Sequence, residues 1–343
     1  MSSKGDDKLE THRPADTKLV ISGYLKFTLW RPPAELAERV RRRWPEMRVV
    51  HLPHHDQLAP ELPDADIFVG YLLRPEQLRL TKHLKWLHSV AAGVAQLMYP
   101  ELLESGIIVT NASGVHAIPM AEHVIGMILA LLRDFPGSMR YQLEHRWAQQ
   151  EIWDGRAWPR ELHGQTAVLV GFGAVGRAVA ERLRAMGVHV WAVTRSGQAD
   201  PALAERSFPV AQLDAALGEA DIVILAAPDT PETRRMIGAA QLARLKPWAI
   251  LINVARGSLV DEPALVSALQ NRAIAAAGLD VASQEPLPPE SPLWALDNVL
   301  ITPHTSGVTE RLWEREAELL LDNLERWFSG QPLRNRVDLS KGY

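Results

Sequence analysis

The sequence predicts an α/β fold with two domains, each built around a parallel sheet. The chain of 343 residues is long enough for two domains of ordinary size. Short runs rich in β-branched residues alternate with amphipathic helical segments, and strands separated by helices pair in parallel. A glycine-rich turn in the middle of the chain opens a second series of the same kind. These three observations define the expected fold class.

The first series extends to about residue 110. Its expected strands are at residues 18–24, 48–52, 66–71 and 107–110. Residues 1–16 are polar and charged, without an apolar stretch of signal-peptide length, and we expect them to form a disordered lead-in. The longest apolar stretch, at residues 124–132, is far shorter than the roughly 20 residues that a bilayer span requires. We therefore expect a cytoplasmic protein that does not enter a membrane.

The second series extends from residue 166 to about residue 302. Its expected strands are at residues 167–170, 189–193, 221–225, 249–253, 275–279 and 299–301. Six strands in series are typical of a complete doubly wound sheet. An almost wholly apolar helix at residues 119–133 precedes them and is expected to be buried, either inside its domain or against a second subunit. A helix at residues 308–328 has an apolar stripe that must pack on another element.

The composition is that of an ordinary globular protein. Hydrophobic residues make up 47% and charged residues 23% of the chain, which argues against disorder and against a fibrous architecture. The formal net charge of -4 gives no general attraction for nucleic acid or for an anionic membrane. The absence of cysteine excludes disulfides and Cys-ligated metals. His51, His54 and His55 lie in a proline-bounded loop without suitable metal-binding partners, so no metal site is expected.

A Gly-x-Gly-x-x-Gly turn connects an expected strand to an expected helix. Gly171 permits the tight turn, Gly173 lets the backbone approach a pyrophosphate, and Gly176 allows close packing of the helix on the strand. Ala174 and Val175 open the helix, whose N-terminal N–H groups and dipole favour a bound phosphate. The turn therefore predicts a dinucleotide site.

The residues at the end of the next strand indicate which dinucleotide is preferred. An NAD enzyme places an acidic residue about 20 residues after the turn, where it binds the ribose 2′-hydroxyl. This chain has Thr194, Arg195 and Ser196 there. A guanidinium can pair with a 2′-phosphate, and the two hydroxyls can donate to it. NADP(H) is therefore the preferred cofactor, with NAD(H) possible.

Three later segments carry reactive side chains where strands end. Arg256, Glu285 and His304 follow the fourth, fifth and sixth strands of the second series, and ligands of an open α/β sheet bind at the carboxyl ends of its strands. Such a set beside a dinucleotide turn resembles that of the 2-hydroxyacid dehydrogenases. The resemblance implies reduction of a 2-keto acid, which needs a hydride, a proton for the carbonyl oxygen and a clamp for the carboxylate. Histidine is the side-chain type that exchanges protons near neutral pH, so His304 is the expected acid and base. Glu285 would orient it, and the planar Arg256 guanidinium would bind the substrate.

The order of these motifs resembles that of the D-isomer-specific 2-hydroxyacid dehydrogenases, particularly the glyoxylate and hydroxypyruvate reductase branch. The resemblance covers nearly the whole chain, because the matching segments are residues 86–94, 110–114, 121–123, 171–176, 228–233, 253–257, 293–298, 302–304 and 330–338.

The resemblance implies a particular domain arrangement and further binding residues. A dinucleotide-binding domain at residues 113–307 would be inserted in a discontinuous, flavodoxin-like substrate domain at residues 17–112 and 308–343, with the active site in the cleft between two Rossmann-like domains. The implied binding residues are the backbone of Gly93 and Val94 for the substrate carboxylate, Asp280 for the nicotinamide carboxamide, and Pro228, Thr233 and Val254 for the cofactor. Related enzymes look dimeric through the region of the apolar helix, so a homodimer is expected.

Several alternatives belong to the same superfamily. Formate dehydrogenase has Gln where this chain has Glu285, and phosphoglycerate dehydrogenases often append a regulatory domain, which we do not expect after Tyr343. From another class, a nucleotide-sensing corepressor with little turnover shares the fold and the catalytic set.

Leu72 follows a strand of the substrate domain and is expected to contact a substrate with a small or aliphatic side chain, although a packing role fits it equally well.

Overall fold

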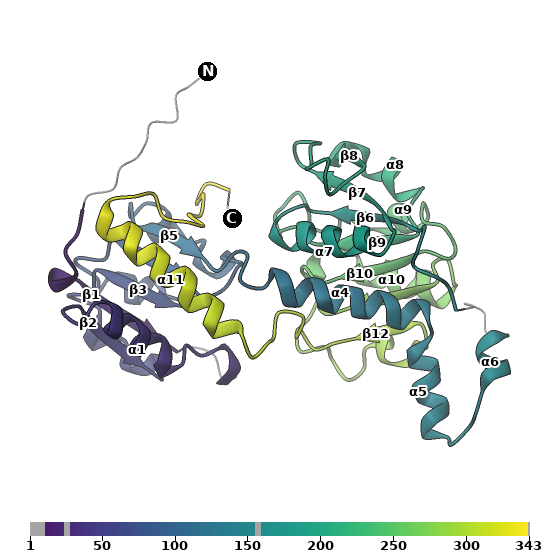
Figure 1. Ribbon diagram of the computed structural model, residues 1–343, viewed down its shortest axis with the longest axis horizontal. Coiled ribbons are helices and arrows are strands. Elements are labelled where there is room, and N and C mark those ends of the chain that lie inside the picture. Colours follow the sequence, from purple (N-terminus) through teal and green to yellow (C-terminus); the bar gives the residue numbers. More distant parts are fainter. Residues whose placement is uncertain (1–10, 24–27, 155–158, 342–343) are drawn as a thin grey trace. The chain divides into compact units, whose positions relative to one another are not determined.

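The computed structural model describes residues 11–23, 28–154 and 159–341, and the chain divides into two compact units (Figure 1). The first unit comprises Met1–His116 and Val308–Tyr343, and the second comprises Ala117–Gly307. The second unit thus begins at residue 117 and not at the expected residue 113. The intervening residues stay with the first unit because Ala112 and Val115 pack with Leu312 in a small buried cluster.

The first unit is built on a five-stranded sheet in which every pairing is parallel. The strands have the order β2-β1-β3-β4-β5, which is the flavodoxin-like doubly wound order. They are β1 (Lys18–Ser22), β2 (Arg48–Leu52), β3 (Ile67–Gly70), β4 (Trp86–Ser89) and β5 (Ile108–Asn111).

Helices cover both faces of this sheet. The buried side chains of α1 (Ala34–Arg43) and α11 (Leu312–Ser329) pack on one face, and those of α2 (Pro75–Leu78) and α3 (Pro100–Leu103) pack on the other. Successive strand residues point to opposite faces, so Ile67 faces α11 while Phe68 lies in the other cluster. The expected apolar stripe of the last helix therefore has a partner within its own unit.

The second unit has a seven-stranded parallel sheet with the order β12-β11-β10-β9-β6-β7-β8. The order reverses beside β6, where a Rossmann sheet binds its dinucleotide. The strands are β6 (Thr166–Val170), β7 (His189–Thr194), β8 (Arg206–Pro209), β9 (Ile222–Leu225), β10 (Ile250–Asn253), β11 (Ala276–Leu279) and β12 (Val299–Ile301).

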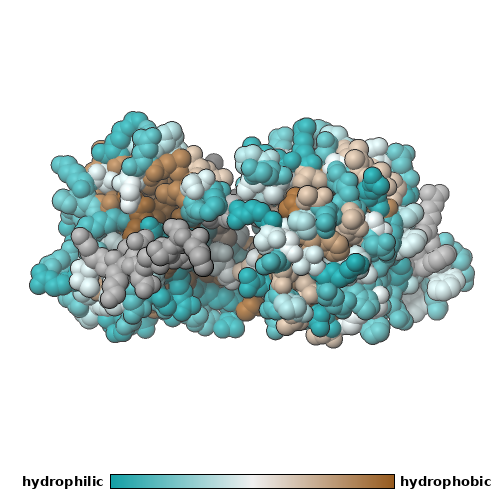
Figure 2. Space-filling view, turned by 90° about the horizontal axis from the view of Figure 1, so that it is seen from above, coloured by the Kyte–Doolittle hydropathy of each residue, from teal (hydrophilic) through white to brown (hydrophobic). Residues whose placement is uncertain are grey.

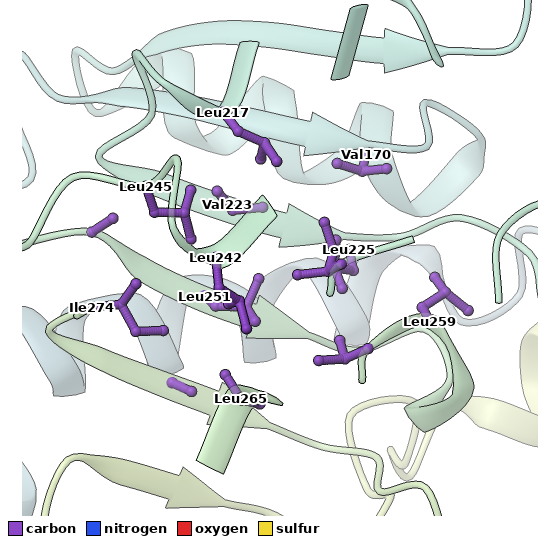
Figure 3. Packing of buried hydrophobic residues seen from close by; sticks show 14 of the residues in the cluster. Val170, Leu217, Val223, Leu225, Leu242, Leu245, Leu251, Leu259, Leu265 and Ile274 are labelled. Carbon is purple, nitrogen blue, oxygen red and sulfur yellow. The ribbon is translucent and has the colours of Figure 1, made fainter. Parts of the chain in front are cut away.

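Two hydrophobic layers hold the helices on this second sheet. Leu217, Leu242 and Leu265 come from α8 (Leu213–Leu217), α9 (Ala239–Leu242) and α10 (Glu262–Gln270) and pack on one face, as Figure 3 shows. The opposite face is covered by α4 (Ala117–Leu132) and α7 (Ala174–Ala185), which lie side by side in Figure 1. Beyond the C-terminal end of α4 follow α5 (Phe135–Leu143) and α6 (Gln149–Trp153).

The predicted fold class is confirmed, with differences in detail. The sequence predicted neither β4 nor β8. The Trp-Leu-His-Ser run of β4 contains two polar residues, and the four-residue edge strand β8 has two exposed residues and no apolar run. The last helix begins at Leu312, later than predicted.

The predicted disordered lead-in is partly ordered. In residues 11–16, the His12 ring stacks on the Trp327 ring with their centroids 4.2 Å apart, and Pro14–Asp16 forms a 3-10 turn. Residues 1–10 and Tyr24 lie outside the described part of the chain.

The surface is mostly hydrophilic, as the composition of an ordinary globular protein predicts. In each unit, the face drawn in Figure 2 is mostly hydrophilic and has smaller hydrophobic areas. No helix of the described residues is long and apolar enough to cross a membrane.

Candidate active site

The glycine-rich turn lies between β6 and α7, at the carboxyl edge of the second sheet. Gly171 has a φ of 96°, and a Cβ added to it would lie 2.6 Å from the backbone of Ala226. A Cβ on Gly176 would lie 2.4 Å from the carbonyl oxygen of Gly171. The turn is therefore tight, and the helix approaches the strand more closely than any side chain would allow.

The start of α7 fits a phosphate. Gly173 is the N-cap residue of α7 and has no side chain that could cap the helix. The first N–H groups of α7, including those of Ala174 and Val175, are therefore not capped by this residue. A Cβ built on Gly173 would meet nothing within 4 Å. This open, positively polarised helix end is the cradle that a dinucleotide pyrophosphate requires.

The side chains predicted to recognise the 2′-phosphate lie where β7 ends. Thr194 is partly exposed, and Arg195 and Ser196 are exposed. The Thr194 and Ser196 oxygens are 3.4 Å apart, and Thr194 Oγ1 donates to the carbonyl oxygen of Gln198. The positive charge of Arg195 is close enough to contribute to lowering the pKa of Glu232, after larger effects of the Thr230 hydrogen bond and of the Glu232 backbone.

The other residues predicted to bind the cofactor occupy different surroundings. Thr233 Oγ1 donates to the carbonyl oxygen of Pro228 at 2.6 Å and so closes the loop after β9. Val254, after β10, is only 2% exposed and belongs to the hydrophobic cluster under α4 and α7. Thr233 thus shapes its loop, while the Val254 side chain is part of the core.

His304 and Glu285 form a hydrogen-bonded pair at the carboxyl ends of β12 and β11. His304 Nδ1 lies 2.7 Å from Glu285 Oε2, and both side chains are partly open to solvent. Because a carboxylate only accepts hydrogen bonds, Nδ1 carries a proton and Nε2 is the ring nitrogen left for a ligand. The pair predicted from sequence is therefore formed in this unit.

The surroundings of Glu285 keep it ionised. Burial tends to raise its pKa, but the hydrogen bond with His304, the His304 charge, the backbone N–H of Ala282 and the charge of Arg256 together lower its pKa. An ionised Glu285 can stabilise the protonated imidazole. The arrangement is suited to a histidine that gives up and regains a proton.

Arg256 follows β10 in an adjacent loop. Its Nη1 donates to the carbonyl oxygen of Ala255 at 2.6 Å, and the residue is exposed. A Cβ on the next residue, Gly257, would lie 1.9 Å from the carbonyl oxygen of Ala282. This close backbone approach brings the Arg256 loop against the loop that carries Glu285. The three reactive side chains therefore extend from three neighbouring strand ends, as the sequence predicted.

Asp280, at the end of β11, is buried beneath the turn that carries His304. Its Oδ1 accepts from Thr302 Oγ1 at 2.6 Å and from the backbone N–H of Thr305 at 2.9 Å, and both its oxygens accept from the N–H of Ser306. The N–H of His304 donates to the carbonyl oxygen of Asp280. Sequence reasoning gave Asp280 a role toward the cofactor and missed this structural one.

The residues predicted to bind substrate in the first unit follow β3 and β4. Leu72 is partly exposed, Gly93 is partly exposed, and Val94 is 2% exposed at the start of a short 3-10 turn. Gln96 Nε2 donates to the carbonyl oxygens of Tyr71 and Gly93, so one side chain connects the two loops. Sequence reasoning missed this connection.

Comparisons with known proteins agree with this chemistry. A family model described as "D-isomer specific 2-hydroxyacid dehydrogenase, NAD binding domain" matches residues 125–306. A glyoxylate reductase of Pyrococcus furiosus is 34% identical over 299 residues, which are 84% of this chain and 86% of that protein.

Solved structures give the same result. A D-isomer-specific 2-hydroxyacid dehydrogenase of Xanthobacter autotrophicus, in complex with NADPH and MES, is 30% identical with a TM-score of 0.81, covering 95% of this chain and 99% of that one. An NADPH-dependent glyoxylate/hydroxypyruvate reductase of Sinorhizobium meliloti, with NADP and sulfate, is 26% identical with a TM-score of 0.79, covering 95% and 100%.

The fold, the dinucleotide turn and the histidine–carboxylate pair define an NAD(P)-dependent oxidoreductase. The chain belongs to the D-isomer-specific 2-hydroxyacid dehydrogenase family and is similar to its glyoxylate/hydroxypyruvate reductase branch. The comparisons do not favour the corepressor alternative.

The glycine turn gives a prediction with a built-in control. Gly171→Ala should lower thermal stability, because the new Cβ clashes with the Ala226 backbone at a positive φ. Gly173→Ala should leave stability nearly unchanged, because its Cβ meets open space, yet weaken cofactor binding by roughly tenfold or more if the pyrophosphate sits there. Thermal unfolding and fluorescence titration with NADPH measure the two effects. Equal effects of both substitutions would contradict the assignment.

The pH dependence of Glu285→Gln provides a second prediction. The pKa of Glu285 is lowered in the folded protein, so the carboxylate stays ionised at neutral pH and is protonated only when the pH falls below the ordinary glutamate value of 4.5. Removing this charge should reduce kcat for keto-acid reduction at neutral pH by about tenfold or more and move the falling alkaline limb of the profile to lower pH. Glu290→Gln, which changes an exposed carboxylate of the same loop, is the control. An unchanged profile for Glu285→Gln would disprove its role.

Proposed function

We propose that this protein reduces a small 2-keto acid to the D-2-hydroxy acid with NADPH, with His304 as the proton donor. The observation that carries the proposal is the 2.7 Å pair between His304 Nδ1 and Glu285 Oε2 at the same sheet edge as the dinucleotide turn. Such a pair leaves Nε2 facing away from the carboxylate, and Nε2 carries a proton when the imidazole is charged. A substrate carbonyl oxygen is the group that this proton would reach.

The steps of the proposed reaction follow from the positions of the protein's own groups. The cofactor, when bound at the glycine turn, supplies the hydride for the carbonyl carbon. His304 Nε2 gives its proton to the carbonyl oxygen as negative charge develops there, and Glu285 stabilises the imidazole while it is charged. In the oxidation direction the same nitrogen accepts the proton from the hydroxyl group.

Arg256 and the first unit would bind the substrate. The Arg256 guanidinium presents several donors in one plane, which suit the carboxylate and the adjacent carbonyl oxygen of a 2-keto acid. The N–H groups of Gly93 and Val94 would bind the same carboxylate, and Leu72 would contact the substituent on C2. Glyoxylate or hydroxypyruvate, or a small aliphatic 2-keto acid, is the proposed substrate, in keeping with the names of similar proteins.

The end of β7 supports a preference for NADP(H). Thr194, Arg195 and Ser196 offer two hydroxyls and a guanidinium, and residues 193–199 contain no carboxylate to bind a ribose 2′-hydroxyl. Two similar structures hold NADPH or NADP. The remaining proposed cofactor contacts are Pro228, Thr233, the backbone of Val254, and Asp280 toward the carboxamide.

We also propose that the protein is a homodimer that pairs through α5 and the segment after it. Phe135, Met139 and Leu143 recur every four residues on one side of α5 and are 54%, 64% and 82% exposed. Trp147 is 94% and Trp153 is 63% exposed in the following residues. Such an apolar stripe is costly in water and is typical of an interface between subunits.

Turnover tests the proposed reaction. The wild-type protein should oxidise NADPH, followed by absorbance, with at least one member of a panel of 2-keto acids. His304→Ala should lower kcat by about 10²- to 10⁴-fold while NADPH still binds. The exposed His54→Ala serves as the control. Full activity of the His304 variant would refute the proton-donor assignment, and no turnover by the wild type on any acid would refute the reaction.

Cofactor specificity tests the role of Arg195. Replacing it with alanine should raise KM for NADPH roughly tenfold or more and leave KM for NADH nearly unchanged, because only NADPH carries the 2′-phosphate. Arg184→Ala, at an exposed position on α7, should affect neither value. A wild-type enzyme that prefers NADH would overturn the proposed preference.

Sedimentation equilibrium tests the dimer. The wild type should have twice the chain mass of 38.1 kDa, and Leu143→Glu should shift it toward the monomer because a charge would be buried at the interface. Trp248→Glu, at a half-exposed residue outside this segment, is the control. A monomeric wild type at micromolar concentration would contradict the proposal.

A further inference from the structure

A chain of hydrogen bonds connects α4 to the turn that carries His304. His123 Nε2 on α4 lies 3.0 Å from Thr302 Oγ1, and Thr302 Oγ1 lies 2.6 Å from Asp280 Oδ1. Asp280 in turn holds the backbone N–H groups of Thr305 and Ser306. His123 is therefore connected to the turn through the side chains of Thr302 and Asp280. None of the described contacts joins it directly to Arg256, Glu285 or His304.

The direction of these hydrogen bonds is fixed by their donors. Asp280 Oδ1 accepts from two backbone N–H groups, so it acts as an acceptor toward Thr302 as well. Thr302 therefore donates its single hydroxyl proton to Asp280. The Thr302 oxygen must then accept from His123, and His123 carries a proton on Nε2.

The charge of Asp280 gives His123 a second role. The Asp280 side chain is 0% exposed, and a buried carboxylate is costly unless hydrogen bonds and positive charge compensate it. Within residues 11–23, 28–154 and 159–341, His123 is the titratable side chain found in ion-pair range of Asp280, with Nε2 3.7 Å from Oδ1. The His123 N–H dipole therefore lies close to the buried carboxylate on which the turn depends.

The turn needs such support because His304 adopts an unfavourable backbone conformation. Its φ of 54° lies in the left-handed region, which a non-glycine residue adopts only when the surroundings impose it. The hydrogen bonds that Asp280 accepts from Thr302, from Thr305 and from the N–H of His304 itself impose it here. Anything that weakens Asp280 should let the His304 side chain move.

We propose that His123 is a positioning residue for His304, acting through Thr302 and Asp280. This inference rests on the proposed function of His304. His123 donates to Thr302, Thr302 donates to Asp280, and Asp280 fixes the turn in which Nδ1 of His304 meets Glu285. Loss of the first donor leaves the Thr302 oxygen unsatisfied and the Asp280 charge less well compensated.

Paired substitutions in the full-length protein test the proposal. His123→Phe keeps a ring and removes the donor, while His123→Gln restores an amide donor near the same place. Thr302→Val removes the hydroxyl without changing the size of the side chain, and Thr302→Ser restores it. Glu122→Gln changes the exposed neighbour of His123 on α4 and is the control.

The expected result is a loss of kcat without loss of binding. His123→Phe and Thr302→Val should each lower kcat by about 10- to 100-fold, with KM changed less than about twofold. His123→Gln and Thr302→Ser should recover most of the activity. The double variant should be no worse than the poorer single one, because both substitutions break one chain. Additive losses, or full kcat in His123→Phe, would overturn the proposal.

A second readout does not depend on turnover. In protein labelled at histidine Cε1, His123→Phe should change the chemical shift and the titration midpoint of His304, assigned by its absence in His304→Ala, whereas Glu122→Gln should not. Thermal unfolding confirms that each variant is folded. If the wild type reduces no 2-keto acid, the proposed function fails, and the His304 signal still decides whether His123 positions the turn. An unchanged His304 signal would overturn the positioning role.

Discussion

The buried carboxylate of Asp280 is the constraint on which the site depends. It lies at the end of β11 and satisfies the donors of the turn after β12, so it joins two neighbouring strand ends. In doing so it holds His304 in a left-handed conformation that the residue would not adopt alone. The His304 imidazole is thus positioned by the sheet beneath it, which is the pre-organisation that the proposed proton transfer requires.

Close backbone packing supplies the rest of the geometry. Gly257 lets the Arg256 loop approach the loop of Glu285, and Gly171 lets the dinucleotide turn bend beside β9. The first unit uses a buried polar pair for a similar purpose: His88 on β4 lies 2.9 Å from Glu316 on α11, and its other nitrogen lies 2.7 Å from Thr110. This pair fixes the last helix against the strand that leads to Gly93.

The sequence predicted the parts of the fold whose signal is local. Buried parallel strands such as β9 and β10 are short apolar runs, and the dinucleotide turn begins at Gly171, whose positive φ few other residues adopt easily. The edge strand β8 lacks such a run, and the order of residues 11–16 depends on the stacking of His12 on Trp327, which is distant in sequence. Local patterns carry no information about such contacts.

The candidate site shows the same division. Arg256, Glu285 and His304 were predictable because each follows a strand, and parallel strands end at one edge. The contact between His123 and Thr302 spans 179 residues, and the side chain comes from a helix whose pattern shows only that it is buried. The carboxylate of Asp280 likewise has partners that become visible only when β11 and β12 are side by side. Buried polar networks are specified by the assembled fold and not by any one segment.

The transfer of hydride itself tests the central claim most directly. NADPH deuterated at both positions of C4 would be incubated with the protein and a 2-keto acid that it turns over and whose product is chiral, which excludes glyoxylate. The product would be examined by mass spectrometry and chiral chromatography. We expect one deuterium at C2 and the D enantiomer of the hydroxy acid. A product without deuterium at C2, or the L enantiomer, would contradict the assignment of this site.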